Sequence, residues 1–337
     1  MIFAQVSVED AEGAVLAHSV TCLEKRLRKG IVLKQSHIDM LLAVGQKTVS
    51  VARLEAGDID ENTAATMLTK ALVPDPEASG VKCTTAFTGR VNLISTGPGI
   101  VVQHADKLIE MNAIDPMISC ATVPQFQQLG EGGMIATVKI ISYSVGRDNL
   151  TAACDIAQNA IKRQAPLLKT ASLLISQSDG GPGDKGVKAI QARLSALGVF
   201  LERVETVPHE IDPMAAHLGQ FQSDLMLILT SSATSDIFDT APTAVRRAGG
   251  EVRRFGMPVD PGNLLFLGHL NDRPVIGLPG CVRSPALNGA DWVLSRTVCG
   301  IQCDDASFAQ MSVGGLLKEI PTRPHPRRSK DTRTGLG

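Results

Sequence analysis

The apolar positions between residues 170 and 300 fall into short runs that alternate with amphipathic stretches. Short apolar runs are typical of buried strands, whereas apolar residues three and four apart are typical of helices. The pattern predicts strands at 171–176, 201–207 and 225–230, helices at 185–197, 213–221 and 240–248, further strands at 251–255, 263–267 and 274–278, and a helix from Ser284. Strands that alternate with helices favour a mainly parallel sheet covered on both faces. We therefore expect an α/β domain over residues 170–303.

The first 80 residues carry shorter patterns. Cap-like residues predict short helices that begin near Ser7 and Ser36. Asp60 precedes a third helix, whose apolar positions follow the helical period. Two prolines within 73–80 prevent this helix from continuing, so that stretch is a linker. We expect an N-terminal α/β module over 1–72.

The middle of the chain has a different pattern. Short β-branched runs are separated by Gly and Pro clusters between residues 81 and 145. Such spacing is typical of strands joined by turns, so we expect a small β-rich module there. A helical pattern at 149–164 then leads into the α/β domain.

Composition and charge limit the classes of partner. The chain is 44% hydrophobic and 20% charged, with a net charge of −1 and only nine Phe, one Tyr and one Trp. A neutral chain that is poor in aromatic residues favours neither nucleic acid nor anionic lipid as a partner. Residues 318–337 are basic and poor in apolar residues, which predicts a disordered tail.

Cysteine use and apolar run length bear on location. The seven cysteines include no C-x-x-C pair, which favours a reducing compartment over a disulfide framework. The start of the chain has no basic, apolar leader pattern, and the longest apolar runs are too short to cross a membrane. We expect a cytoplasmic protein without a membrane segment.

Three polar loops follow strands of the predicted parallel sheet. Ligands of such sheets bind beyond the carboxyl ends of the strands, which makes these loops the candidate site. The first loop, SDGGPGDKG at 178–186, has glycines before a helix and is either an anion site or a plain turn. The second, 230–242, contains hydroxyl groups with Asp236 and Asp239, which either bind a polar heterocycle or a hydrated metal ion, or cap a helix.

The third loop is GLPGCVRSP at 277–285. Ser284 and Pro285 have the residue types of a helix N-cap and first position, and Arg283 beside them would favour phosphate or carboxylate. Cys281 fits a small buried thiol better than a nucleophile, because no histidine is near it in sequence. A fourth polar loop, 258–268, has the composition of a turn.

Several motifs in these loops, taken in order, resemble the molybdenum-cofactor domain of molybdenum insertases and molybdopterin adenylyltransferases. They are TSSAT (230–234) with Asp239 after it, GGEV (249–252), DPGNL (260–264) and GLPGCVRS (277–284). The stretches RKGIVL (28–33) and VSVARLEAGDI (49–59) are similar to the opening domain of insertases. FGMPVDPGNLL (255–265) and PGCVRSP (279–285) are similar to a subgroup of molybdopterin-binding proteins, some of which continue into a nucleotidyltransferase domain.

The resemblance implies a three-layer domain that binds molybdopterin, with magnesium and molybdate as further candidates. It implies catalytic roles for Asp184, Asp236 and Asp239, with Asp236 and Asp239 as metal ligands. The implied pterin-binding residues are Ser231, Ser232, Thr234, Pro261, Gly262, Asn263, Pro279, Gly280, Cys281, Arg283 and Ser284. It also implies partners, either a nucleotidyltransferase or an apo-molybdenum hydroxylase, and we expect a homo-oligomer.

The departures from the family pattern bear on activity. Ser231 and Ser232 replace glycines of a T-G-G-T-G loop, and Asn263 replaces a lysine. Side chains then occupy space at the ligand, and a phosphate-pairing charge is lost. We expect a protein that binds and presents molybdopterin; the alternative is an enzyme, a molybdopterin molybdenumtransferase or an adenylyltransferase. A nicotinamide dehydrogenase ranks behind both, because no glycine fingerprint follows the first strand.

Overall fold

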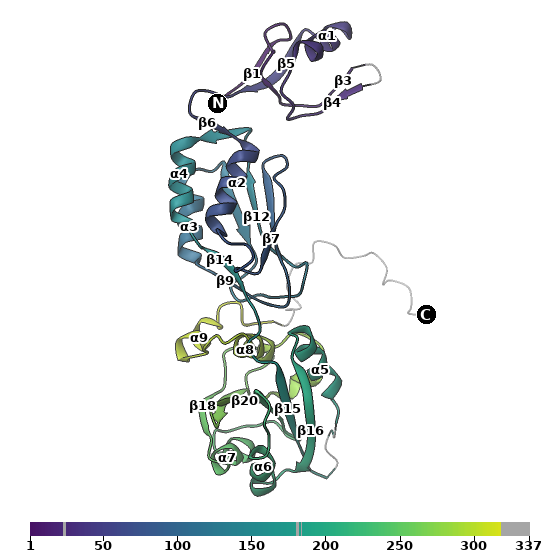
Figure 1. Cartoon of the computed structure of the whole chain (residues 1–337). Coiled ribbons are helices and arrows are strands. Elements are labelled where there is room, and N and C mark those ends of the chain that lie inside the picture. The colour runs from purple at the N-terminus through teal and green to yellow at the C-terminus, as the bar shows by residue number, and fades with distance from the viewer. Residues whose placement is uncertain (23–24, 180–181, 183, 318–337) are drawn as a thin grey trace, which may run out of the picture. The chain divides into compact units, whose positions relative to one another are not determined.

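The computed structural model describes residues 1–22, 25–179, 182 and 184–317. The chain divides into two compact units, Met1–Leu167 and Leu168–Gly337 (Figure 1). The predicted basic tail, 318–337, lies outside the described residues, as do three glycines of the first candidate loop, Gly180, Gly181 and Gly183. In the part of the chain that is described, no helix is both long and apolar enough for a membrane span.

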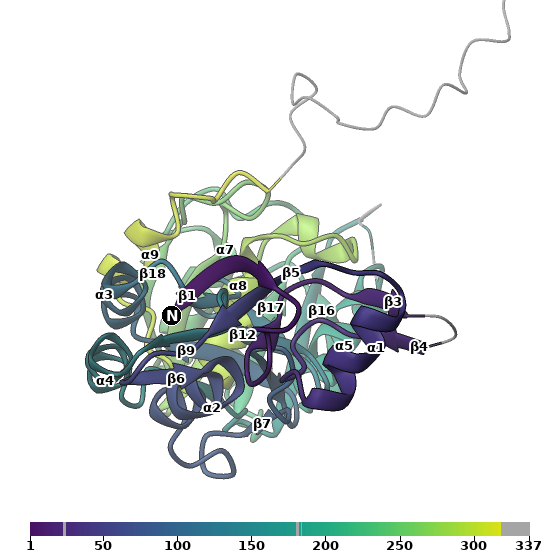
Figure 2. The same cartoon turned by 90° about the horizontal axis from the view of Figure 1, so that it is seen from above.

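The first unit begins with a small antiparallel sheet in which β1 pairs with β5 along its whole length (Figure 2). The helix predicted near Ser7 is wrong: Ser7 ends β1, and a turn follows that buries Val8 and Ala11. The helix predicted near Ser36 is confirmed, and it ends before Gly45, whose φ of 76° suits glycine. The elements here are β1 (Ile2–Ser7), β2 (Val15–Leu16), β3 (Val20–Cys22), β4 (Lys25–Leu27), α1 (Gln35–Ala43) and β5 (Thr48–Arg53).

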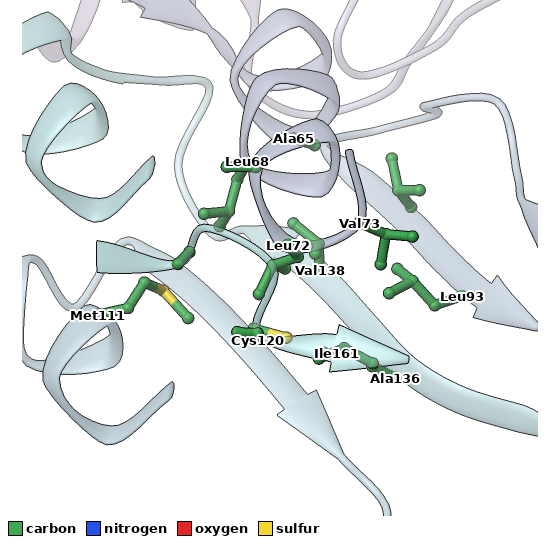
Figure 3. Packing of buried hydrophobic residues seen from close by; sticks show 14 of the residues in the cluster. Ala65, Leu68, Leu72, Val73, Leu93, Met111, Cys120, Ala136, Val138 and Ile161 are labelled. Atoms are coloured by element: carbon green, nitrogen blue, oxygen red, sulfur yellow. The ribbon is translucent and has the colours of Figure 1, made fainter. Parts of the chain in front are cut away.

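The rest of the first unit is built on α2 (Glu61–Leu72). Asp60 caps this helix as predicted, since its carboxylate accepts hydrogen bonds from Asn62 N and Thr63 N, both at 3.1 Å. The buried face of α2, with Leu68 and Leu72, packs on β8 and β12 (Figure 3). The strands are β6 (Asp58–Asp60), β7 (Val81–Cys83), β8 (Arg90–Ser95), β9 (Gly99–Gln103), β10 (Ile118–Thr122), β11 (Gln128–Leu129), β12 (Met134–Ile140), β13 (Ser144–Gly146) and β14 (Ile161–Gln164).

Two helices of this unit differ from the sequence prediction. The helix α3 (Ala105–Ile114) was not predicted, because it buries only Leu108 and Met111 and its apolar pattern is weak. The helix predicted at 149–164 is too long: α4 (Arg147–Ile156) ends early, and β14 follows it. The reason is pairing with a distant strand, since β14 forms an antiparallel ladder with β9.

The second unit contains a six-stranded sheet in the order β16-β15-β17-β20-β19-β18. The first four strands are mutually parallel as predicted, whereas β19 pairs antiparallel with both β20 and β18, so the sheet is mixed. The mixed α/β class of the chain is thereby confirmed. The strands are β15 (Thr170–Gln177), β16 (Phe200–Pro208), β17 (Leu225–Leu229), β18 (Glu251–Phe255), β19 (Phe266–Leu270) and β20 (Arg273–Leu278).

Two hydrophobic cores lie on the two faces of this sheet, because successive side chains of a strand point to opposite faces. Leu173 belongs to a core with α5 (Val187–Ala196) and α8 (Gly289–Val298). Leu174, the next residue, belongs to a core with α6 (Ile211–Leu218) and α7 (Thr240–Arg247). A short helix, α9 (Asp305–Gln310), joins the first of these cores through Phe308.

Two predicted boundaries in this unit are wrong. The strand expected at 263–267 is β19 and begins only at Phe266, because the preceding residues form the loop after β18. The helix expected from Ser284 is α8, and its N-cap is Asn288. The Asn288 side chain accepts from Ala290 N at 3.0 Å and Asp291 accepts from Asn288 N at 2.8 Å, a reciprocal capping box. Residues Gly280–Arg283 form a separate 3-10 turn, η1.

The start of the parallel sheet supplies a test of pH dependence. Asp224 accepts hydrogen bonds from Lys169 N (2.7 Å) and Thr170 N (3.1 Å), and its own N–H donates to Thr170 Oγ1 (3.0 Å). The backbone hydrogen bond from Lys169 is the main cause that lowers the pKa of Asp224 below its usual value. Because the folded state holds the ionised form, this stabilisation is complete above the unfolded pKa of about 3.9 and is lost as the pH falls through the lower folded value.

We predict that Asp224→Asn lowers the free energy of unfolding at pH 7, and that its difference from wild type shrinks as the pH falls below about 3.9. Urea unfolding of both proteins over this range measures the difference. Asp272→Asn, on an exposed turn of the same unit, is the control and should have little effect. A difference that stays constant with pH would contradict this role of Asp224.

Candidate functional site

The strand register brings four loops to one edge of the sheet in the second unit. Ile175 pairs with Leu229 and Leu229 with Leu278, so the parallel strands end together. Phe255 pairs with Phe266, which in turn pairs with Gly277, so the end of β18 lies at the same edge. The loops 178–186, 230–239, 256–265 and 279–288 therefore all start or end there.

Arg283 lies where three of these loops meet. Its Nη2 donates to Thr230 O at 2.7 Å. A Cβ on Gly186 would lie 2.7 Å from Arg283 Cγ, and the φ of 109° at Gly186 also requires glycine. Burial lowers the pKa of the Arg283 guanidinium below its usual value.

Two buried polar atoms at this junction have no partner. Arg283 Nε and Ser231 Oγ form no hydrogen bond with any described residue. A buried polar group without a partner costs free energy, so such atoms are usually satisfied by a bound group or water. A guanidinium N–H and a hydroxyl are suitable donors for an anionic oxygen. The two donors therefore have the chemistry that suits a phosphate or carboxylate.

Ser176, at the buried end of β15, connects the second loop to the segment after β16. Its hydroxyl accepts a hydrogen bond from Ser231 N at 3.3 Å and lies 2.7 Å from His209 Nδ1. Sequence analysis identified neither Ser176 nor His209. The signal for both is their position, since each lies at the carboxyl end of a strand in the parallel part of the sheet.

Arg193 of α5 holds the third loop and was also missed. Its guanidinium uses all five N–H donors: Nε binds Asp291 Oδ1 at 2.6 Å, and the two terminal nitrogens bind four backbone carbonyls. The carbonyls belong to Ala189, Val282, Ser284 and Ala286. A sequence signal exists, because Arg193 stands next to the buried Leu194 in an amphipathic helix.

The three acidic residues of the resemblance do not form a cluster. Asp239 caps α7, and its two oxygens accept from Thr240 N (2.6 Å) and Ser235 N (2.9 Å). Asp236 Oδ1 accepts from Phe238 N at 2.8 Å, and Asp184 is exposed. Among the described residues, no three His, Cys, Asp or Glu side chains are grouped as a metal site would require. The catalytic and metal-binding roles of these carboxylates stay predictions.

The remaining loop residues differ in what they can offer a ligand. Gly262 is buried, and a Cβ there would lie 2.6 Å from Gly289 N, so this glycine serves packing on α8. Pro261 O accepts from Gly289 N at 2.8 Å in the same contact. Thr234 and Pro279 are also buried, whereas the exposed candidates are Ser232, Asn263, Gly280 and Ser284.

Cys281 and Ser284 need separate comment. Burial is the main cause that raises the pKa of the Cys281 thiol, which favours the inert thiol over the thiolate. The helix N-terminus predicted at Ser284 is wrong, because Ser284 follows the 3-10 turn, its hydroxyl accepts from Ala286 N at 3.2 Å, and α8 begins after Asn288. Within this loop the positively charged side chain is Arg283.

Comparison with known proteins gives a match for the N-terminal strands. Residues 5–53 match the family model of a domain of unknown function (DUF8806). No curated protein matches the chain. Among solved structures, the chain is similar to a molybdopterin biosynthesis moea protein from Pyrococcus horikosii, with 13% sequence identity and a TM-score of 0.29, over 89% of this chain and 74% of that one. At this TM-score the similarity establishes neither a common fold nor a common site.

We predict that Arg193→Met lowers the free energy of unfolding of the second unit by about 1–3 kcal/mol, because it leaves the half-buried Asp291 carboxylate and four backbone carbonyls without their donor. The free energy of unfolding of Arg193→Lys should lie between those of Arg193→Met and wild type, since one ammonium cannot reach five acceptors. Urea unfolding measures both values.

Arg253→Met is the matched control. The Arg253–Glu251 pair is 3.8 Å long and both side chains are more than 60% exposed, at 66% and 62%. The loss of such an exposed pair should cost less than about 1 kcal/mol. Equal losses at positions 193 and 253 would contradict the role assigned to Arg193.

Proposed function

We propose that the protein binds molybdopterin at the loop edge of the six-stranded sheet, and that it acts in the biosynthesis or maturation of the molybdenum cofactor. The observation that carries this proposal is the junction at Arg283. There, two buried donors without partners lie between the loops that contain the TSSAT and GLPGCVRS motifs. The location of helices on both faces of the sheet supports the three-layer arrangement that the resemblance implies.

The chemistry of the ligand fits the donors. Molybdopterin has a phosphate at one end and a polar heterocycle at the other. A guanidinium with a neighbouring hydroxyl suits the phosphate, and we assign it to Arg283 and Ser231. Backbone amides and hydroxyls of the adjoining loops suit the remaining polar atoms. The proposed contacts are Ser231, Ser232, Thr234, Pro261, Asn263, Pro279, Gly280, Cys281, Arg283 and Ser284, without Gly262 because it packs on α8.

We propose further that the protein is a carrier that presents the cofactor to a nucleotidyltransferase or an apo-molybdenum hydroxylase. Phosphoryl chemistry on a nucleotide requires metal ligands and charge at the reacting phosphates. Asp239 uses both oxygens to hold backbone N–H groups, and Asn263 brings no charge. An insertase or adenylyltransferase would need Asp184, Asp236 and Asp239 to converge on one ion. Among the described residues no such group of carboxylates is present, which favours the carrier.

We predict that Gly280→Leu abolishes molybdopterin binding and leaves the fold intact. A Cβ at Gly280 would lie 3.5 Å from Arg283 Nη1, an ordinary contact, so the backbone tolerates a side chain. The leucine would cover the guanidinium and exclude a phosphate. Loss of the charge-assisted hydrogen bonds should weaken binding by about 100-fold or more. Fluorescence titration with molybdopterin released from a molybdenum hydroxylase, under anaerobic conditions, measures the affinity.

Gly130→Leu is the control for the added side chain. Gly130 is exposed, and its Cβ would have no neighbour within 4 Å. This variant should bind as wild type does, and thermal unfolding should show that both variants are folded. An unchanged affinity for Gly280→Leu would place the ligand elsewhere.

A further inference from the structure

A groove lies beside this junction, between the carboxyl ends of β15 and β16. It has a volume of about 640 Å³ and more polar than apolar lining. Gln177, Ser178 and Asp179 form one wall, and the residues from Thr206 to Glu210 form the other. We call it the β15–β16 groove. Its size suits a small heterocycle.

The contact of His209 Nδ1 with Ser176 leaves Nε2 as the ring nitrogen available in the groove. Ser176 Oγ accepts from Ser231 N (3.3 Å) and lies 2.7 Å from His209 Nδ1, and we assign the hydroxyl as the donor of this second bond. The neutral ring then carries its proton on Nε2. His209 therefore offers an N–H donor, and the same serine connects it to the loop at Ser231.

Glu210 follows directly and offers the opposite polarity. It is the N-cap residue of α6, with an extended backbone (φ −135°, ψ 149°), yet its side chain caps no helical N–H. It is exposed and forms no ion pair with any described residue. Adjacent residues of one wall thus present a donor and a carboxylate that the fold does not use.

We propose that the β15–β16 groove binds the amino-pyrimidinone edge of the pterin. This edge carries, in order, an amino group, a ring N–H and a carbonyl. A carboxylate accepts from the first two, as it does from a guanidinium, and an N–H donor binds the third. Glu210 and His209 supply this complementary set. The inference rests on the proposed function and adds the residues that select the heterocycle.

The test compares pterin with lumazine, which has a carbonyl in place of the amino group. Wild type should bind pterin about tenfold or more tightly, because lumazine leaves the carboxylate facing an acceptor. In Glu210→Gln the preference should fall to less than about threefold, since an amide can donate to that carbonyl as well as accept. Fluorescence titrations of the full chain with each compound measure the ratio.

Asp212→Asn is the matched control. This substitution removes the same charge two residues later in the chain. The Asp212 side chain is 78% exposed, pairs with Arg247 at 3.4 Å and does not line the groove. Its pterin preference should equal that of wild type. A purely structural role of Glu210 would change both affinities together and leave their ratio unchanged.

The two proposals fail in different ways. If wild type binds molybdopterin but Glu210→Gln keeps its preference for pterin over lumazine, the groove assignment is overturned and the proposed function stands. If wild type binds no molybdopterin, the proposed function is overturned and this inference falls with it. If Glu210→Gln loses the preference for pterin and Asp212→Asn keeps it, both proposals are supported.

Discussion

The hydrogen bonds of the Arg193 guanidinium are the interactions on which the candidate site depends most. It binds the carbonyls of Val282 and Ser284, which flank Arg283 in the chain, and so fixes the backbone from which Arg283 reaches Thr230. The desolvation of the half-buried Arg193–Asp291 pair offsets part of its attraction, so the contribution of Arg193 to net stability is smaller than its hydrogen bonds suggest. Its main effect is geometric. Together with the N-terminal end of α8, where Asp291 accepts from Arg193 and Asn288 donates to Ala286 O, it holds an irregular loop in place.

Much of the second unit, Leu168–Gly337, could be predicted from sequence, because its strands are short apolar runs and parallel strands end at a common edge. The errors have physical causes. At Ser284 and Pro285 a good local capping pair lost to the capping box of Asn288 and Asp291, which the sequence also contains. Arg193 could not be paired from sequence, since Asp291 is 98 residues away. The sequence pattern predicts helix where β14 lies, because only the ladder with β9 distinguishes this segment as a strand.

The acidic residues show why residue type alone leaves function open. Asp236 and Asp239 follow a buried strand, where either metal ligands or caps are expected. In the structure their oxygens accept backbone N–H groups and hold the second loop. Among the described residues, groups without a partner at the edge include a guanidinium N–H, a hydroxyl and the Glu210 carboxylate. The carrier role that we propose would use such groups to hold a ligand through hydrogen bonds and charge.

The most direct test of the account is to identify the ligand that the full chain retains when it is purified anaerobically from a host that makes molybdenum cofactor. Iodine oxidation converts molybdopterin to a fluorescent pterin, and elemental analysis measures molybdenum in the same sample. The account predicts a fluorescent pterin at about one per chain in wild type, as expected for a single site. A protein that carries no pterin under these conditions, with or without molybdenum, would contradict it.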